Sequence, residues 1–452
     1  MFSNILKQIR SITDKPLTVF DWVMFFVTAA GCFFIFQQGG ILHTGGSSIT
    51  YLCGHFLDFY DYNVKPMIGN NYLPSSYILY AIWNIPLKLF GIVPEPTMSV
   101  GFWTIMWYKV LPVGFYLATA IVIYKICNQI GFGSLKSKLC AFAWLVSPIA
   151  FFSQFIFGQY DIFTVFFMLI GMYFYYKGGM TKFILFFSIA ITFKYFPLFI
   201  FIPLLLLREK NKWNIVRSMA FVMIPFALEV LIYIASPAFK TGVFGFGATS
   251  FILKPAFCSG MTEVSIFVLS ILILFIWAYF IEPKNDKDLV KWGLYISNIV
   301  LFLLFGLSFW HPQWLLFAVP FWTISTFISK KFDLFILLDI AMMLFFIIYT
   351  VNTWTNHVDQ HLFTLGALSD MSKNIDTLTM RKLFLFTDRK ILFTLFSAMV
   401  LANAVFKHPK LCVDNFAEPI EKYWWMIRVK FIVGIAIFLI PALVSFIVAQ
   451  MV

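Results

Sequence analysis

The sequence predicts an all-α, polytopic membrane protein with about 13 transmembrane helices. Of its 452 residues, 61% are hydrophobic, 20% are aromatic and only 12% are charged. A soluble domain carries about 25% charged residues and could not hide this much apolar surface from water. The apolar residues form long runs separated by short basic clusters, and a helix that spans the bilayer needs about 20 such residues.

The basic residues predict the topology. A net charge of +12 would suit a nucleic-acid-binding protein, but Lys and Arg lie in short clusters between apolar runs, which is the positive-inside pattern. We therefore expect no nucleic-acid partner and a cytoplasmic N-terminus, residues 1–16. The later clusters should share that side: Lys136/Lys138, Lys177/Lys182, Arg208 to Arg217, Lys284 to Lys291, Lys330/Lys331 and Lys407/Lys410.

One apolar segment, Ser75 to Val93, conflicts with this topology because counting it as a span would invert every later basic cluster. We predict that it forms interfacial or re-entrant helices in a long first extracytoplasmic loop, residues 38–104. The pieces 183–193 and 196–207 are each too short for a bilayer of about 30 Å, so they should meet near Lys194. The predicted spans are 17–37, 105–127, 138–157, 162–177, 183–193, 196–207, 214–236, 262–281, 290–309, 314–329, 332–351, 384–406 and 427–449.

The chain is predicted to form a single transmembrane domain, 1–452, because it shows no internal repeat, low-complexity tract or soluble domain. No small-residue cleavage site follows Leu17 to Gln37, which indicates a membrane anchor and not a signal peptide. The six cysteines are scattered, with no CxxC pair and no His/Cys cluster of metal-ligand spacing. No metal site is therefore predicted from them.

Unusual polar residues fall on one side under this topology. They lie in the first loop, in the turn Gly158 to Asp161, at Lys194, in Trp310 to Trp314, and in a late extracytoplasmic loop, residues 352–383. Polar groups at membrane depth are costly, so their convergence indicates a functional site. The plainer alternative is that each is a helix cap or a solvated loop residue.

Four of these segments carry a resemblance. Together Asn71 to Tyr77, Phe157 to Asp161, Phe193 to Pro197 and His311 to Trp314 resemble the motifs of GT-C fold glycosyltransferases, which use polyprenyl-phosphate sugars. The resemblance implies juxtamembrane helices in the first loop. It also implies transfer of a single sugar to a hydroxyl group on the extracytoplasmic side. No soluble nucleotide sugar is expected, since the sequence has no Gly-rich nucleotide loop.

The general base is expected in the first loop, where the family keeps an essential acidic residue. The candidates are Asp58 and Asp61, which a helix would place on one face at i and i+3. We favour Asp58 because it follows a fully apolar pair and should be partly desolvated. Asn71 stands where related glucosyltransferases have an aspartate before the Tyr-Pro run, which leaves the choice between the two open.

The resemblance also implies residues for the two substrates. Those expected to hold the donor phosphate and sugar, with Asp161 in a supporting role, are His311, Gln313, Lys194, Gln159, Tyr160, Asp161, Trp314 and Arg381. Those expected in the acceptor loop are Tyr72, Asn71 and His55. The chemistry needs a carboxylate base, donors for the phosphate and aromatic surfaces for the sugar ring. Metal dependence is left open because carboxylates are available, but no divalent metal is expected, since monophosphate donors in this family usually do without one.

The sequence thus predicts an inverting glycosyltransferase in a bacterial plasma membrane or the endoplasmic reticulum. Its partners would be a polyprenyl-phosphate sugar, a glycan, glycolipid or cell-surface polymer as acceptor, and the bilayer. The alternative is a lipid or solute transporter or flippase, because half-length helices meeting at Lys194 also occur in transporters. A structural subunit without activity would instead make these polar residues dispensable.

Overall fold

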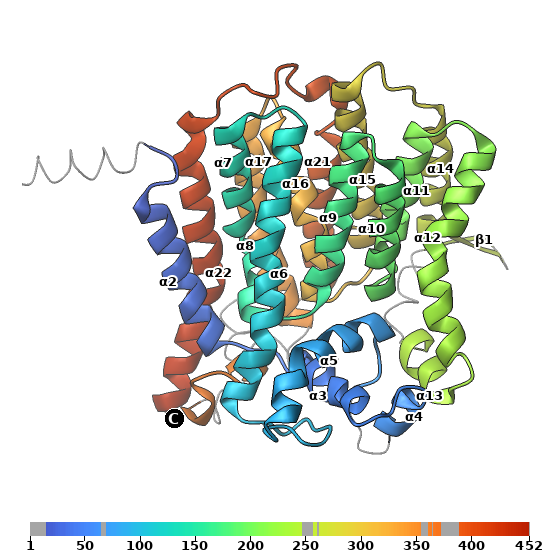
Figure 1. Cartoon of the computed structure of the whole chain (residues 1–452). Coiled ribbons are helices and arrows are strands. Elements are labelled where there is room, and N and C mark those ends of the chain that lie inside the picture. Colours follow the sequence, from blue (N-terminus) through green and yellow to red (C-terminus); the bar gives the residue numbers. More distant parts are fainter. Residues whose placement is uncertain are drawn as a thin grey trace, which may run out of the picture.

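The computed structural model describes residues 15–64, 69–245, 256–259, 262–353, 360–363, 365–371 and 388–451. Figure 1 shows that most helices run side by side in one bundle, with short helices across its lower end. The helices are α2 (Val19–Ile35), α3 (Gly40–Leu52), α4 (Phe59–Val64), α5 (Pro74–Leu89), α6 (Phe102–Gln129), α7 (Ser134–Leu145), α8 (Pro148–Phe151), π-helix η1 (Phe152–Phe157), α9 (Asp161–Lys177), α10 (Met180–Phe193), α11 (Phe196–Arg208), α12 (Lys212–Tyr233), α13 (Pro237–Phe239), π-helix η2 (Lys240–Phe244), α14 (Ile266–Phe280), α15 (Asp286–Phe305), η4 (Pro312–Phe317), α16 (Val319–Phe327), α17 (Phe332–Thr353), α19 (Gln360–Phe363), η5 (Ser369–Met371), α21 (Arg389–Val405), η6 (Pro409–Leu411), η7 (Glu421–Tyr423) and α22 (Trp424–Met451).

The described helices confirm a polytopic helical membrane fold. Five are long and apolar enough to cross a bilayer, and up to seven when two bent pairs each count as one span. Every predicted span contains a helix. The count of 13 crossings stays a prediction. One boundary was wrong: Thr262–Ser265 is strand β2, paired antiparallel with β1 (Ala256–Ser259), so the helix begins only at Ile266.

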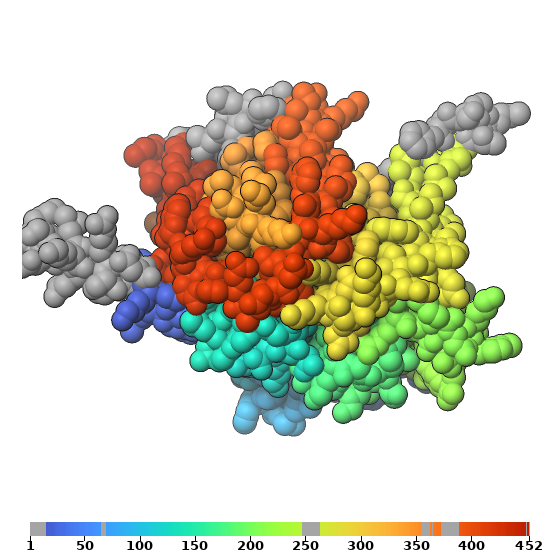
Figure 2. Space-filling view, turned by 90° about the horizontal axis from the view of Figure 1, so that it is seen from above, coloured from blue at the N-terminus to red at the C-terminus, as the bar shows by residue number. Residues whose placement is uncertain are grey.

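The basic loops lie together at one end of the bundle. Contacts between loops far apart in sequence show this: Lys136 Nζ donates to Glu418 O (3.0 Å), Lys210 Nζ to Ile281 O (2.9 Å), Lys291 Nζ to Asp414 Oδ1 (2.8 Å) and Lys330 Nζ to Lys410 O (3.3 Å). Figure 2 views the bundle from this end. The hydrogen bond from Lys291 lowers the pKa of the Asp414 carboxyl. The predicted clustering of these loops is confirmed, and the membrane side they face stays a prediction.

The opposite end is covered by α3, α4, α5 and α13 (Figure 1). Helix α5, which contains most of Ser75 to Val93, packs against α3: Asn84 Nδ2 donates to Gly45 O (3.1 Å) and to Ser48 Oγ (3.0 Å). Pro74 begins α5, as expected for a residue without a backbone N–H to donate. The segment is therefore a helix of this end layer and not part of the bundle, as the charge pattern predicted.

Three breaks interrupt the apolar helices of the chain. Helix α2 bends by 70° into α3, α7 bends by 51° into α8 and η1, and α10 ends one turn before Pro197 of α11. The predicted meeting point of the two half-length pieces at Lys194 is confirmed. Such breaks free polar backbone groups, which a membrane protein tolerates only where they are buried or line a cavity.

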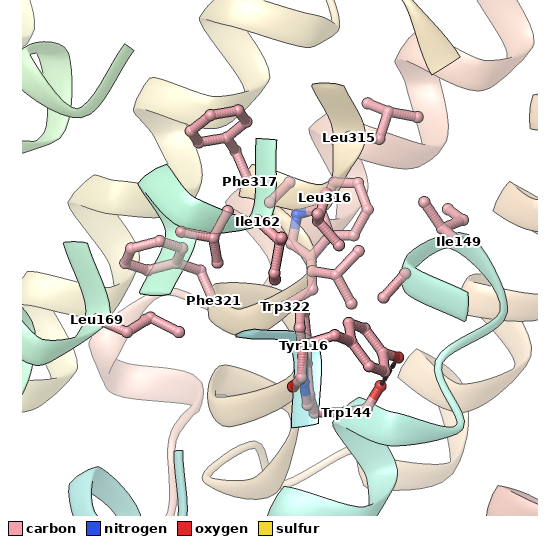
Figure 3. Packing of buried hydrophobic residues seen from close by; sticks show 14 of the residues in the cluster. Tyr116, Trp144, Ile149, Ile162, Leu169, Leu315, Leu316, Phe317, Phe321 and Trp322 are labelled. Carbon is pink, nitrogen blue, oxygen red and sulfur yellow. Dashed lines mark hydrogen bonds between the residues drawn. The ribbon is translucent and has the colours of Figure 1, made fainter. Parts of the chain in front are cut away.

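The bundle interior is packed with aromatic and aliphatic side chains (Figure 3). Tyr116 is fully buried, and its hydroxyl donates to the carbonyl oxygens of Trp144 (3.2 Å) and Leu145 (2.9 Å). Trp322 and Phe321 of α16 pack in the same cluster. A buried tyrosine usually needs such a partner for its hydroxyl.

Candidate functional site

A cavity of about 370 Å³ lies where the helix breaks meet the end layer. Its residues come from the α2–α3 bend, the loop before α5, the η1–α9 turn, the α10–α11 break, the α12 and η2 region, and η4. They are Gln38, Gly40, His43, Asn71, Tyr72, Leu73, Phe157, Gln159, Tyr160, Asp161, Phe193, Lys194, Tyr195, Phe196, Phe226, Val243, Phe244, His311, Pro312, Gln313 and Trp314. All four motif segments singled out in the sequence therefore contribute to one cavity.

An ion pair lies in the wall of this cavity. Lys194 donates to Oδ1 of Asp161, and their side chains are 11% and 1% exposed. The Lys194 ammonium also lies 4.6 Å from the ring centre of Trp314 and 5.2 Å from that of Phe196. Aromatic faces stabilise a desolvated cation. The other oxygen, Asp161 Oδ2, is buried and has no hydrogen-bond partner in the described structure.

Three glutamine side chains from distant segments form a hydrogen-bonded chain along the cavity. Gln313 Nε2 donates to Gln159 Oε1 (3.2 Å), and Gln159 Nε2 donates to Gln38 Oε1 (2.7 Å). Gln38 Oε1 also accepts from the backbone N–H of Gly40 (2.5 Å). A Cβ at position 40 would lie 2.0 Å from Gln159 Nε2 and 2.6 Å from that oxygen, so a larger residue there would displace these two side chains. These hydrogen bonds fix the orientation of the three glutamine side chains that line the cavity.

The η1–α9 turn positions Gln159 to Asp161. Gly158 has φ +67°, a left-handed conformation that glycine adopts without strain, and a Cβ there would lie 2.5 Å from Gln37 Oε1. Gln37 is fully buried, and its Nε2 donates to Phe157 O (3.1 Å) and Gly158 O (3.3 Å). The α2–α3 bend is thus joined directly to the turn that carries Asp161.

Other predicted donor residues line the same space. Pro312 begins η4, so His311 lies just outside the helix, with its ring 5.0 Å from that of Trp314. Across the cavity, the rings of Tyr72 and Tyr160 are 4.4 Å apart. The structure brings together nine of the predicted site residues: Asn71, Tyr72, Gln159, Tyr160, Asp161, Lys194, His311, Gln313 and Trp314.

The first-loop carboxylates are placed elsewhere. Asp58 is exposed and its Oδ2 lies 2.9 Å from His55 Nδ1; Asp61 is exposed and its Oδ1 accepts from Ala238 N (3.3 Å). Neither they nor His55 line the cavity. The reason given for preferring Asp58 was wrong, because the apolar pair before it, Phe56 and Leu57, is itself 61% and 76% exposed. Their catalytic role stays a prediction.

Several lining residues were missed in the sequence. Gln38, His43 and Tyr195 bring polar groups, whereas Phe226 and Phe244 bring apolar surface. The run Gln37-Gln38-Gly39-Gly40 directly after an apolar span was an available signal for the first of these. Arg381 lies outside the described residues. The next arginine along the chain, Arg389, begins α21 and does not line the cavity.

The donor set favours an anionic ligand with hydroxyl groups over a metal ion. Among the described lining residues Asp161 is the single acid, and no group of three or more His, Cys, Asp and Glu side chains suited to a metal ion occurs in the described part of the chain. The cavity instead offers an ammonium group, two imidazoles, four side-chain amides and many aromatic faces. Such a set can bind a phosphate through charge-assisted hydrogen bonds and a sugar through amides and rings.

Comparisons with known proteins gave matches among solved structures only. No protein-family model and no curated protein matches the sequence. The crystal structure of ArnT from Cupriavidus metallidurans bound to undecaprenyl phosphate is similar over 86% of this chain and 77% of that chain, with 13% identity and a TM-score of 0.45. The apo state of ArnT gives the same coverage, 12% identity and a TM-score of 0.41. The chemistry of the site therefore has to be read from this chain's own residues.

Proposed function

We propose that this protein is an inverting glycosyltransferase that moves a single sugar from a polyprenyl-phosphate carrier to a hydroxyl group of a glycan, glycolipid or cell-surface polymer. The observation that carries the proposal is the buried pair Lys194–Asp161, with the second Asp161 oxygen unpartnered in the described structure. It places a cation and a carboxylate in one cavity of aromatic and amide groups. Transfer from a sugar phosphate requires all of these groups.

Lys194 and His311 are the proposed phosphate ligands. The Lys194 ammonium is nearly buried and held between aromatic rings, so an incoming phosphate would meet it in a site of low dielectric. The glutamine chain and the Tyr72 and Tyr160 rings then face the sugar. The carrier is proposed to be a polyprenyl phosphate, the chemical kind to which the undecaprenyl phosphate bound by ArnT belongs.

Asp161 is the proposed general base. The acceptor oxygen attacks C1 of the sugar from the face opposite the phosphate, the bond between C1 and the phosphate oxygen breaks, and Asp161 Oδ2 takes the acceptor proton. The polyprenyl phosphate leaves with the negative charge, which Lys194 stabilises. This assignment differs from the first-loop aspartates because Asp161 is the acid that lines the cavity. The site is proposed to face the extracytoplasmic side, at the end of the bundle opposite the basic loops.

The test is incubation of the purified protein with a panel of synthetic polyprenyl-phosphate sugars, with and without a divalent cation. Release of free polyprenyl phosphate should occur from at least one donor in the presence of a hydroxyl acceptor, and Asp161→Asn should abolish it. If no donor is consumed under any condition, a transporter becomes the better proposal. The break between α10 and α11 at Lys194 is the observation that would then count in its favour, because transporter helices are often interrupted at the binding site.

A further inference from the structure

A second buried lysine lies behind the cavity wall. Lys109 of α6 is fully buried, and no ion pair of the described structure includes it. Its Nζ donates to the carbonyl oxygens of Phe33 (2.8 Å), Phe36 (2.5 Å) and Phe155 (2.8 Å), with Cys32 O at 3.5 Å. The ammonium also lies 5.0 Å from the ring centre of Phe33. In the described structure the Lys109 ammonium is therefore bound by backbone carbonyl oxygens and not by a carboxylate.

These carbonyls belong to two chain segments that both end at the cavity. Phe33 and Phe36 lie at the end of α2, where the chain bends by 70°, and Phe155 lies in the π-helix η1. Carbonyls at the end of a helix lack intrahelical partners and carry partial negative charge, so a cation stabilises them. One ammonium holds both ends in contact.

Groups that line the cavity follow each segment directly. Gln38 lies two residues after Phe36, and Gln159 to Asp161 begin four residues after Phe155. Gln37 Nε2 bonds the carbonyls of Phe157 and Gly158, and Gln38 Oε1 accepts from Gln159. A displacement of either segment at Lys109 would separate Gln38 from Gln159 and shift Asp161.

We propose that Lys109 is a positioning residue of the site: it fixes the α2 end and η1 relative to each other, and so keeps Gln38, Gln159 and Asp161 in register. It does not line the cavity. The ligand-binding test of this inference rests on the proposed function, whereas the hydrogen-exchange test rests on the structure alone. A lysine that served only to stabilise the bundle would lower the melting temperature and leave the ligand contacts of the folded protein unchanged.

Lys109→Met removes the donors and keeps most of the side-chain volume. Lys407→Met is the matched control, because Lys407 is equally buried and bonds Trp322 O (2.8 Å) and Thr326 Oγ1 (2.9 Å) away from the cavity. With undecaprenyl phosphate as the probe, Lys109→Met should weaken binding by about 10-fold at temperatures well below melting, as expected when charge-assisted contacts are misplaced. Lys407→Met should lower the melting temperature and bind the probe as the parent does.

Double variants separate positioning from general destabilisation. Lys109→Met and Gln159→Ala should be non-additive, because Gln159 is already displaced in the first variant. Additive effects with Gln159→Ala would overturn the proposal. If Lys109→Met does not fold, Lys109→Gln, which keeps two N–H donors without the charge, is measured in the same cycles with the same expectation.

Hydrogen exchange tests the inference without any ligand. The amides of Gln37 and Gly158 donate to Leu362 O and Ser153 O and should exchange at least about 10-fold faster in Lys109→Met than in the parent, through local opening. In Lys407→Met these amides should be unaffected. Unchanged exchange in Lys109→Met would overturn the positioning role. Absence of probe binding to the parent, together with faster exchange in the variant, would instead reject the proposed function and leave the positioning role standing.

Discussion

The described part of the chain buries two lysine–aspartate pairs, and they differ in what surrounds them. Lys194 and Asp161 meet at the breaks before α9 and α11, with side chains 11% and 1% exposed. Lys430 of α22 and Asp339 of α17 are 3.0 Å apart, with side chains 2% and 11% exposed. By residue type and burial the two pairs are nearly the same.

The two pairs differ in whether both carboxylate oxygens of the aspartate are hydrogen-bonded. Asp339 Oδ2 accepts from Lys430, and its Oδ1 accepts from Asn403 Nδ2 (3.4 Å), beside a cavity of only about 10 Å³. Asp161 Oδ2 has no partner in the described structure, and Asp161 faces a cavity of about 370 Å³. A buried ion pair alone is weak evidence for function. An unsatisfied oxygen beside a cavity large enough for a ligand is the stronger sign.

The largest expected difference is in how an external thiol reagent reaches the two ends of the bundle. After replacement of the native cysteines, single cysteines at Val64 and Glu95 in the end layer should react fully with an impermeant thiol reagent from outside, whereas one at Asp414 should not. All three positions are exposed in the structure. If the Glu95 site reacts only from the side on which Asp414 reacts, the cavity that holds the Lys194–Asp161 pair does not open to the outside as proposed.

Substitution of Asp161 and of Asp339 should have different effects on sugar transfer. Asp161→Asn should reduce sugar transfer by on the order of 100-fold or more, because an amide cannot take the acceptor proton. Asp339→Asn, the matched control, should lower the melting temperature and retain transfer within a few-fold. Initial rates of polyprenyl-phosphate release at a temperature below both melting transitions measure the difference. Equal losses in the two variants would mean that Asp161 is structural.

His311→Ala should weaken donor binding by about 10-fold, as well as turnover, because a contact to the phosphate is lost in ground and transition states alike. Binding of a donor analogue by titration and transfer by initial rate give the two numbers. Unchanged binding with lost turnover would instead assign His311 to the chemical step.

The first-loop aspartates should show the smallest effects. Asp58→Asn and Asp61→Asn should each keep transfer within a few-fold, because both side chains are exposed and neither lines the cavity. Donor binding should be unchanged in both. A loss on the order of 100-fold in either variant, with an unchanged melting temperature, would restore the first-loop base predicted from the family resemblance.

The sequence by itself determined where the helices lie and which segments line the cavity. Apolar runs fixed every predicted span to within a few residues, with the strand before Ile266 as the main exception. The basic clusters determined that Ser75 to Val93 belongs to the end layer, and motifs of four or five residues identified Lys194, Asp161 and His311. These features are local, since composition and charge over a short window are enough to predict them.

Only the tertiary structure decided which of these side chains work together. Asp58 lies just before α4 and Asp61 lies within it, and the packing of the end layer leaves both side chains exposed. Gln38 and Lys109 acquire their roles through contacts with residues 121 and 46 positions away. Burial and long-range hydrogen bonds depend on how helices pack, so no window of sequence contains them. The sequence therefore predicted which segments line the cavity, and only the fold shows that Asp161 is the carboxylate among the described lining residues.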